Sequence, residues 1–151
     1  MRTYLVVIDE TEEARLALRF AARRAAKTGG SLHILALIER ADCGPWGGVQ
    51  ATMEAENREK AEELVATAAG TIFDELGIQP SITIRDGECV EVVRERLDEH
   101  PEIAALVLGA AAQGNPGPMV AHFNGNNAGT LRCTVMVIPG SLTDEALEEQ
   151  S

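Results

Sequence analysis

Five short apolar runs, separated by longer amphipathic or polar stretches, divide the chain. Most of these runs are rich in branched apolar residues and nearly free of polar ones, which is typical of strands covered on both faces of a sheet. The third run alternates more between apolar and polar residues, as expected of a strand nearer the edge of the sheet. The predicted strands are residues 3–9, 31–39, 81–87, 104–110 and 134–140.

Three of the stretches between these runs repeat their apolar residues at intervals of three and four, which predicts amphipathic helices. They are a helix from about 11 to 28, a long helix from about 50 to 76, and a third that must end before Pro101. The apolar faces are Ala14, Ala17, Leu18, Ala21 and Ala25 in the first helix, Ala61, Leu64, Val65, Ala68, Ala69, Ile72, Phe73 and Leu76 in the second, and Val90, Val93 and Leu97 in the third.

Strand and helix alternate along the whole chain, and this order predicts parallel βαβ units with right-handed crossovers. We therefore expect an α/β fold, a single doubly wound domain over residues 1–140 with helices on both faces of the sheet. The acidic tail, residues 141–151, is predicted to be either a short helix or disordered.

Charge and composition narrow the function classes. The formal net charge of −11 gives an acidic surface, which disfavours binding to nucleic acid or to anionic membranes. No apolar run is long enough to span a membrane, and the N-terminus reads as a buried strand and not as a signal peptide. The three cysteines, Cys43, Cys89 and Cys133, lie far apart and predict neither a disulfide framework nor a zinc site, so we expect a cytoplasmic protein.

The candidate site lies where parallel strands end. In an open parallel sheet, ligands bind beyond the carboxyl ends of the strands, where the strand order reverses. Asp9 stands at the end of the first strand, just before a helix. Its carboxylate can cap that helix, or it can accept a hydrogen bond from a ribose hydroxyl or a base amino group.

Two segments carry a family resemblance. The stretch "YLVVIDETEEARLALRFAARRAAKTGGSLHILALIE" (4–39) and the pair "ALVLGA" (105–110) and "CTVMVIPG" (133–140) resemble the universal stress protein family over residues 2–140. The resemblance implies a five-stranded parallel sheet in the order 3-2-1-4-5. It also implies a homodimer formed through the last strand, Thr134–Ile138, whose exposed apolar edge fits that role.

Members of this family divide into those that bind ATP and those that do not. In binders, residues at the positions of Val7, Asp9 and Leu37 are expected at the nucleoside. The phosphates of binders rest on glycine, two residues, glycine, nine residues, and then glycine followed by serine or threonine. Counted from Gly109, this motif requires glycine at positions 112 and 122 and a hydroxyl at 123, whereas the chain has Ala112, His122 and Phe123.

Two interpretations of the segment after Gly109 remain open. Gly114 and Gly117 can form a variant phosphate cradle, in which case the protein binds ATP or AMP, with Mg²⁺ accompanying the nucleotide and no other metal. Alternatively the segment is only a connector, and the protein is a dimeric interaction module that binds no nucleotide. Either way we expect a regulatory stress-response protein with an unknown protein partner.

No catalytic residue is predicted, because weak ATP hydrolysis would need a metal and a base that the sequence does not locate. A lone His122 could contact phosphate or simply lie at the surface. Trp46, in the loop that begins near Cys43, could cover a ligand or pack against the sheet edge or a dimer partner.

Overall fold

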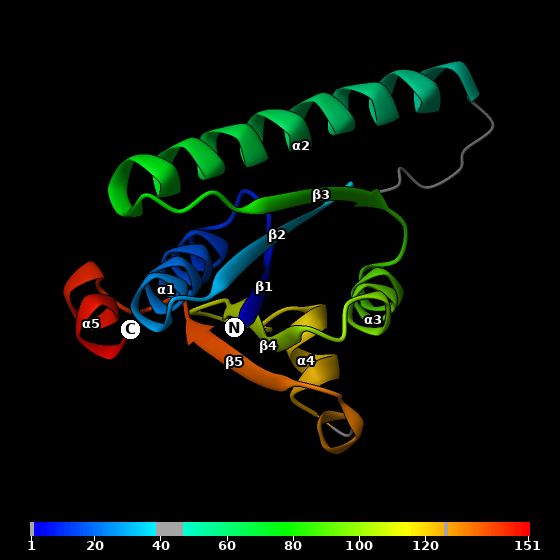
Figure 1. Ribbon diagram of the computed structural model, residues 1–151. Helices are drawn as coiled ribbons and strands as arrows, with labels where there is room; N and C mark the ends of the chain where they lie inside the picture. The colour runs from blue at the N-terminus through cyan, green and yellow to red at the C-terminus, as the bar shows by residue number, and fades with distance from the viewer. Residues whose placement is uncertain (1, 39–46, 126) are drawn as a thin grey trace.

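A five-stranded, all-parallel sheet in the order β3-β2-β1-β4-β5 forms the centre of the computed structural model (Figure 1). The structure describes residues 2–38, 47–125 and 127–151, with residues 47–54 described through their backbone alone. The elements are β1 (Thr3–Ile8), α1 (Glu12–Thr28), β2 (Ser31–Ile38), α2 (Gly47–Leu76), β3 (Ser81–Asp86), α3 (Cys89–Glu99), β4 (Ile103–Ala110), α4 (Pro118–Phe123), the 3₁₀ turn η1 (Ala128–Thr130), β5 (Thr134–Pro139) and α5 (Asp144–Gln150). The predicted doubly wound α/β fold and its strand order are confirmed.

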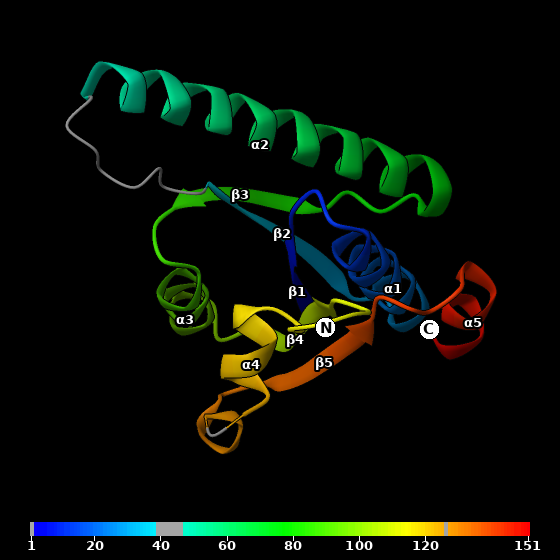
Figure 2. The same ribbon diagram turned by 180° about the vertical axis from the view of Figure 1, so that it is seen from behind.

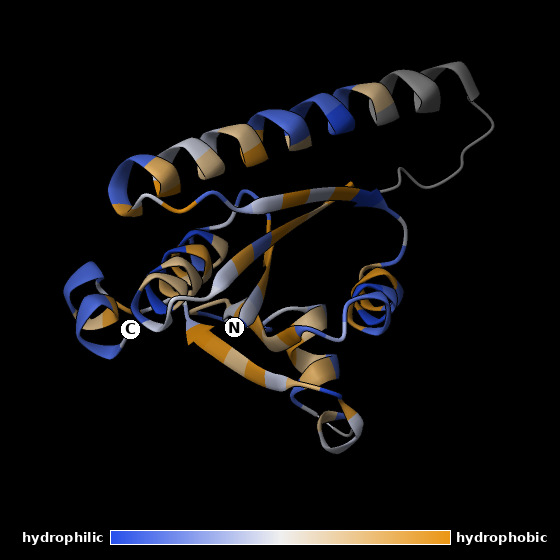
Figure 3. Cartoon of the chain, viewed as in Figure 1, coloured by the Kyte–Doolittle hydropathy of each residue, from blue (hydrophilic) through white to orange (hydrophobic). Residues whose placement is uncertain are grey.

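Alternation along the strands divides the core into two layers. On β1, Tyr4 and Val6 face α1 and α2, whereas Leu5 and Val7 face α3 and α4. Figure 2, seen from behind, shows α3 and α4 on the side of the sheet opposite α1 and α2. Figure 3 shows the hydrophobic colour concentrated on the strands and on the inward sides of the helices. Helices therefore cover both faces, as predicted.

The strand order reverses at β1. The chain moves from β1 to β2 and β3 on one side and then returns to place β4 and β5 on the other side. The crossovers on the two sides diverge, so the carboxyl ends of β1, β2 and β4 border an open crevice. Asp9 directly follows β1 and so stands in that crevice.

One predicted core residue is not in the core. Most of the apolar stripe of α2 packs on the sheet and α1, with Ala61, Val65 and Ile72 fully buried, but Phe73 is 53% exposed. Ile72 takes the buried position in this turn, and the next residue lies about 100° further round the helix. The predicted stripe is thus wider than the face that the rest of the protein covers.

The tail forms a short helix, α5, whose Leu147 is completely buried in the core on the α1 side. Of the two predicted alternatives, helix and disorder, the structure has the helix. A short helix, α4, follows the loop after β4 and lasts only from Pro118 to Phe123. The loop from Cys43 to Trp46 lies outside the described residues, and the proposed domain boundary at residue 140 stays a prediction.

A buried polar cluster lies between β2, β3 and α3. His33 is 8% exposed, and its Nε2 atom lies 2.7 Å from Arg96 Nη2 and 3.0 Å from Thr83 Oγ1. Arg96 Nη2 also donates to Thr83 Oγ1, at 2.8 Å. Burial and then the Arg96 cation lower the pKa of His33 to about 4. His33 is therefore neutral in the folded protein and accepts a hydrogen bond from Arg96.

This cluster predicts a loss of stability in mild acid. The unfolded chain protonates His33 near its ordinary pKa of 6.5 and the folded chain only near 4, so unfolding is favoured as pH falls through this window. Protonation of His33 should lower the free energy of unfolding by up to about 3 kcal/mol. Urea unfolding at pH 7 and pH 4.5 measures the drop. The His33→Gln variant keeps a hydrogen-bond acceptor but does not titrate, so its free energy of unfolding should fall distinctly less between the two pH values. An equal fall in the variant and the wild type would contradict the role given to His33.

Candidate functional site

Four adjoining hollows meet at Asp9, at the carboxyl ends of β1, β2 and β4. The α2-side hollow, about 330 Å³, lies between the ends of β1 and β2 and the helix α2. The α3-side hollow, about 630 Å³, lies on the other face, against the starts of α3 and α4. The loop hollow, about 80 Å³, borders the end of β4, and a fourth hollow of about 270 Å³ separates α1 from α2. Asp9 lines all four.

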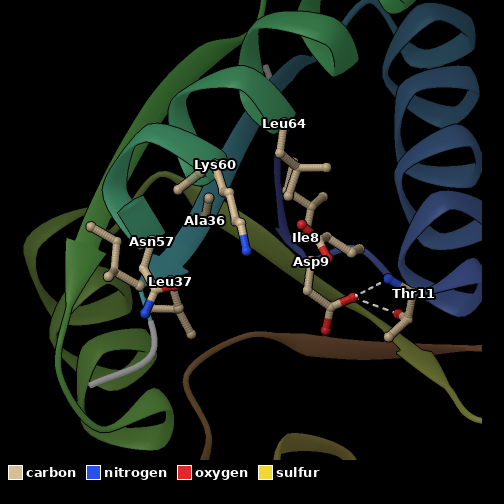
Figure 4. Close-up of a pocket in the computed structure, with 11 residues that line it drawn as sticks. Ile8, Asp9, Thr11, Ala36, Leu37, Asn57, Lys60 and Leu64 are labelled. Carbon is tan, nitrogen blue, oxygen red and sulfur yellow. Dashed lines mark hydrogen bonds between the residues drawn. The ribbon is translucent and has the colours of Figure 1, made fainter. Parts of the chain in front are cut away.

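Asp9 both fixes the start of α1 and faces the open crevice. Its Oδ1 atom accepts from the backbone N–H of Thr11, at 2.8 Å, and from the Thr11 hydroxyl. Thr11 is the N-cap of α1, because its hydroxyl oxygen accepts from the Ala14 N–H. Figure 4 shows the carboxylate of Asp9 at the mouth of the α2-side hollow. Asp9 therefore supports the capping residue without being the cap, and its carboxylate remains open to a ligand.

The structure gathers five of the six predicted site residues around this point. Val7, Asp9 and Leu37 together line the α3-side hollow. Gly109 and Gly117 line the loop hollow, next to Val7 and Asp9. Gly114 lines none of the four hollows. The nucleoside positions implied by the family resemblance thus lie together, whereas the proposed cradle is only partly beside them.

Two residues that sequence reasoning missed also line the crevice. Asn57 and Lys60 of α2 lie over the ends of β1 and β2, and Lys60 extends into the α2-side hollow toward Asp9 (Figure 4). Both belong to the acidic run 54–63, which the sequence analysis leaves without a ligand role. One sequence feature could have placed them there: Asn57 and Lys60 lie one helical turn before Ala61 and Leu64, on the side of α2 that faces the sheet.

The glycines of the predicted cradle have structural reasons to be glycine. A Cβ atom on Gly109 would lie 2.2 Å from the carbonyl oxygen of Glu13, so the residue lets the first turn of α1 pack on β4. Gly114 and Gly117 have φ angles of +74° and +118°, which other residues rarely adopt. These constraints account for the three glycines without a phosphate.

The loop uses two of its own backbone donors internally. The N–H of Gly117 donates to Asn115 Oδ1 at 3.0 Å, and the N–H of Ala111 donates to the carbonyl of Pro116 at 3.2 Å. Pro116 and Pro118 have no N–H to offer. These two bonds and two prolines reduce the number of backbone donors that the segment offers to a phosphate.

Carboxylates dominate the α3 side of the crevice. Glu88 caps α3, accepting from the N–H of Glu91 at 2.9 Å and of Val90 at 3.2 Å, and these bonds lower its pKa. An ionised carboxylate already occupies the position at the helix N-terminus that a phosphate would take. Burial and then the bond to Glu88 raise the pKa of the neighbouring Cys89 thiol, so it is not an activated nucleophile.

His122 belongs to a separate surface contact. Its Nε2 lies 3.0 Å from Arg94 Nη2, so the imidazole accepts from the guanidinium, and its ring packs edge-on against Phe123. It lines none of the four hollows. Within residues 2–38, 47–125 and 127–151, no group of three or more His, Cys, Asp and Glu side chains could hold a metal ion. No helix described by the structure is long and apolar enough to cross a membrane.

Comparison with known proteins agrees with the fold. The model of the universal stress protein family matches residues 1–139. The universal stress protein UspA from Lactobacillus plantarum is 19% identical, with a TM-score of 0.77 over 91% of this chain and 97% of that one. No curated protein sequence matches the chain.

Some similar structures hold an adenine nucleotide. A universal stress protein family protein from Arabidopsis thaliana with AMP bound is 17% identical, with a TM-score of 0.62 and coverage of 96% and 95% of the two chains. The universal stress protein from Archaeoglobus fulgidus in complex with dAMP is 19% identical, with a TM-score of 0.62 and coverage of 91% and 98%. At these identities the likeness shows a shared fold.

Proposed function

The chain belongs to the universal stress protein family, and from this premise we propose that it is a cytoplasmic stress-response regulator that binds an adenine nucleoside or its monophosphate in the α3-side hollow. The supporting observation is the position of Asp9, whose carboxylate lies beside Val7 and Leu37 at the strand ends. Structures of the same fold with AMP, dAMP or cAMP bound support the ligand class.

The α3-side hollow suits a nucleoside in size and chemistry. Its volume of about 630 Å³ falls in the range of roughly 300–1,000 Å³ that is common for small-molecule sites. Val7, Leu37 and Met119 supply apolar surface for a base. The Asp9 carboxylate supplies an acceptor for a ribose hydroxyl or an amino group. All of these contacts involve the base or the ribose, so the hollow can bind a nucleoside that has no phosphate.

The same site disfavours a triphosphate. The loop hollow, beside Gly109 and Gly117, holds only about 80 Å³, and Glu13 borders it together with Asp9. Lys60 is on the other face, in the α2-side hollow. Each added phosphate charge would therefore meet the carboxylates of Asp9 and Glu13. We infer that the protein selects the nucleoside and tolerates one phosphate.

We expect calorimetric titration to give an order of affinity opposite to that of a triphosphate-binding protein. Without Mg²⁺, ATP should bind at least about tenfold more weakly than AMP, because added negative charge near these carboxylates costs about 1 kcal/mol or more. Added Mg²⁺ should reduce the difference in affinity between AMP and ATP, because it neutralises phosphate charge. Tighter binding of free ATP than of AMP would contradict the proposal.

A second candidate function is an interaction module without a nucleotide. It is favoured by β5, an edge strand on which Val135, Met136 and Val137 are only partly buried in the single chain. We propose that Thr134–Ile138 pairs two copies, since an apolar edge strand otherwise invites aggregation. The AMP titration separates the two functions. A protein that is only an interaction module should give no binding heat with AMP or with ATP.

A further inference from the structure

The outer face of α1 carries a row of cations at helical spacing. Arg15, Arg19, Arg23 and Lys27 follow one another at intervals of four residues, which places them along one stripe of the helix. In Figure 1 this helix lies between the sheet and α5. All four side chains contact the C-terminal segment, so the row, called here the basic stripe, is a docking surface that is already occupied.

Each contact joins a cation to an acceptor of the acidic tail. Asp144 Oδ1 lies 3.3 Å from Arg15 Nη2 and 3.4 Å from Arg19 Nη1, and Glu148 Oε1 lies 2.9 Å from Arg19 Nη2. Arg23 Nε donates to the Ser151 hydroxyl at 2.7 Å, and Lys27 donates to the Ser151 carbonyl. The acceptors thus follow the basic stripe from one end to the other.

Leu147 is the main apolar anchor of the contact, and the partly buried Leu142 packs against the same core cluster. Leu147 is completely buried and packs in the core on the α1 side, and the Thr143 hydroxyl caps α5 by accepting from the Ala146 N–H. The remaining residues of the seven-residue helix, apart from the half-buried Ala146, are exposed. The surface therefore recognises two features, a buried leucine and carboxylates three residues before and one residue after it.

The ion pairs contribute little to holding the segment, so its attachment depends mainly on the buried Leu147. The ion pairs of Arg15 and Arg19 with Asp144 and Glu148 are solvent-exposed, and pairs of this kind contribute little to stability. A helix of seven residues is not stable by itself and forms only when docked. Moreover, α5 lies beyond the residues matched by the family model.

We propose that the basic stripe and the Leu147 socket form a binding surface for an acidic amphipathic helix of a partner protein, and that α5 occupies this surface until such a helix displaces it. Charge complementarity specifies the partner. It carries carboxylates three residues before and one residue after a leucine, as Asp144 and Glu148 stand to Leu147. A partner helix longer than α5 would reach the same cations with more apolar surface.

The test uses the full chain and a labelled peptide with the sequence of residues 141–151. In the Asp144→Lys/Glu148→Lys variant, α5 loses its ion pairs with Arg15 and Arg19, while the exposed position of both residues leaves the core intact. Fluorescence anisotropy should show peptide binding at least tenfold tighter to this variant than to the wild type. Adding Arg19→Glu should remove the gain, and raising the salt concentration should weaken it.

A second variant is needed in case the first does not fully release α5 from the basic stripe. Leu147→Ala removes the side chain that fills the socket. Circular dichroism is used to check that the variant is folded. This variant should also bind the peptide better than the wild type. Equal binding by the wild type and both variants, or no binding by either variant, would overturn the proposal. Association of the variants with a second copy of themselves, seen as a concentration-dependent mass without bound peptide, would also overturn it.

Discussion

Replacing Gly109 with alanine should lower the free energy of unfolding by roughly 3 kcal/mol or more. The added methyl would lie 2.2 Å from the Glu13 carbonyl oxygen and 2.5 Å from its carbonyl carbon. Both atoms belong to the backbone of α1, so they cannot move aside without shifting the helix off β4. Urea unfolding at neutral pH measures the loss.

Gly129→Ala is the matched control, because a Cβ atom there would meet nothing within 4 Å. Its stability should stay within about 0.5 kcal/mol of the wild type, as is usual for surface substitutions. If Gly109→Ala retained wild-type stability but lost nucleotide affinity, Gly109 would be a ligand residue and its packing role would be wrong.

Replacing Asp9 with alanine should lower the affinity for AMP by about 10- to 100-fold, the range expected when a hydrogen bond to a charged group is lost. The carboxylate lines every hollow of the crevice and faces the ligand position between Val7 and Leu37. The variant should also lose some stability, because Thr11 would lose the acceptor that holds it. Calorimetric titration with AMP measures the affinity.

Thr11→Ala separates the two roles of Asp9. It removes the hydroxyl that caps α1, which costs about 1 kcal/mol of stability, but it leaves the carboxylate in place. AMP affinity should stay within about threefold of the wild type. Equal losses of affinity in Thr11→Ala and Asp9→Ala would mean that Asp9 acts only through the start of α1.

Much of the fold was predictable because it depends on local pattern. The period of the apolar residues predicted the strands and the three main helices, and their alternation predicted a parallel sheet. The strand order came from the family resemblance and is confirmed. The prediction was wrong at Phe73, since periodicity shows which residues share a face but not how wide a face the neighbours will cover.

The site was predictable at Asp9 and incomplete elsewhere. A strand end is a sequence feature, so Asp9 and Leu37 could be placed at one edge of the sheet, and the family resemblance added Val7. Lys60 and Asn57 could not, because only the path of α2 over the sheet brings them to the crevice. The role of Gly109 depends on the distance between α1 and β4, and the docking of α5 on α1 joins residues more than a hundred positions apart. No local pattern contains either fact.

Native mass spectrometry of the full chain with AMP tests the central claim most directly. The claim is that the crevice at Asp9 binds a nucleoside without a phosphate loop. We expect one AMP per chain on the wild type, a markedly weaker signal from an equal concentration of free ATP, and a strongly reduced AMP signal on a folded Asp9→Ala variant. A wild-type chain that remains bare with AMP, or an Asp9→Ala chain that carries it equally well, would contradict the account.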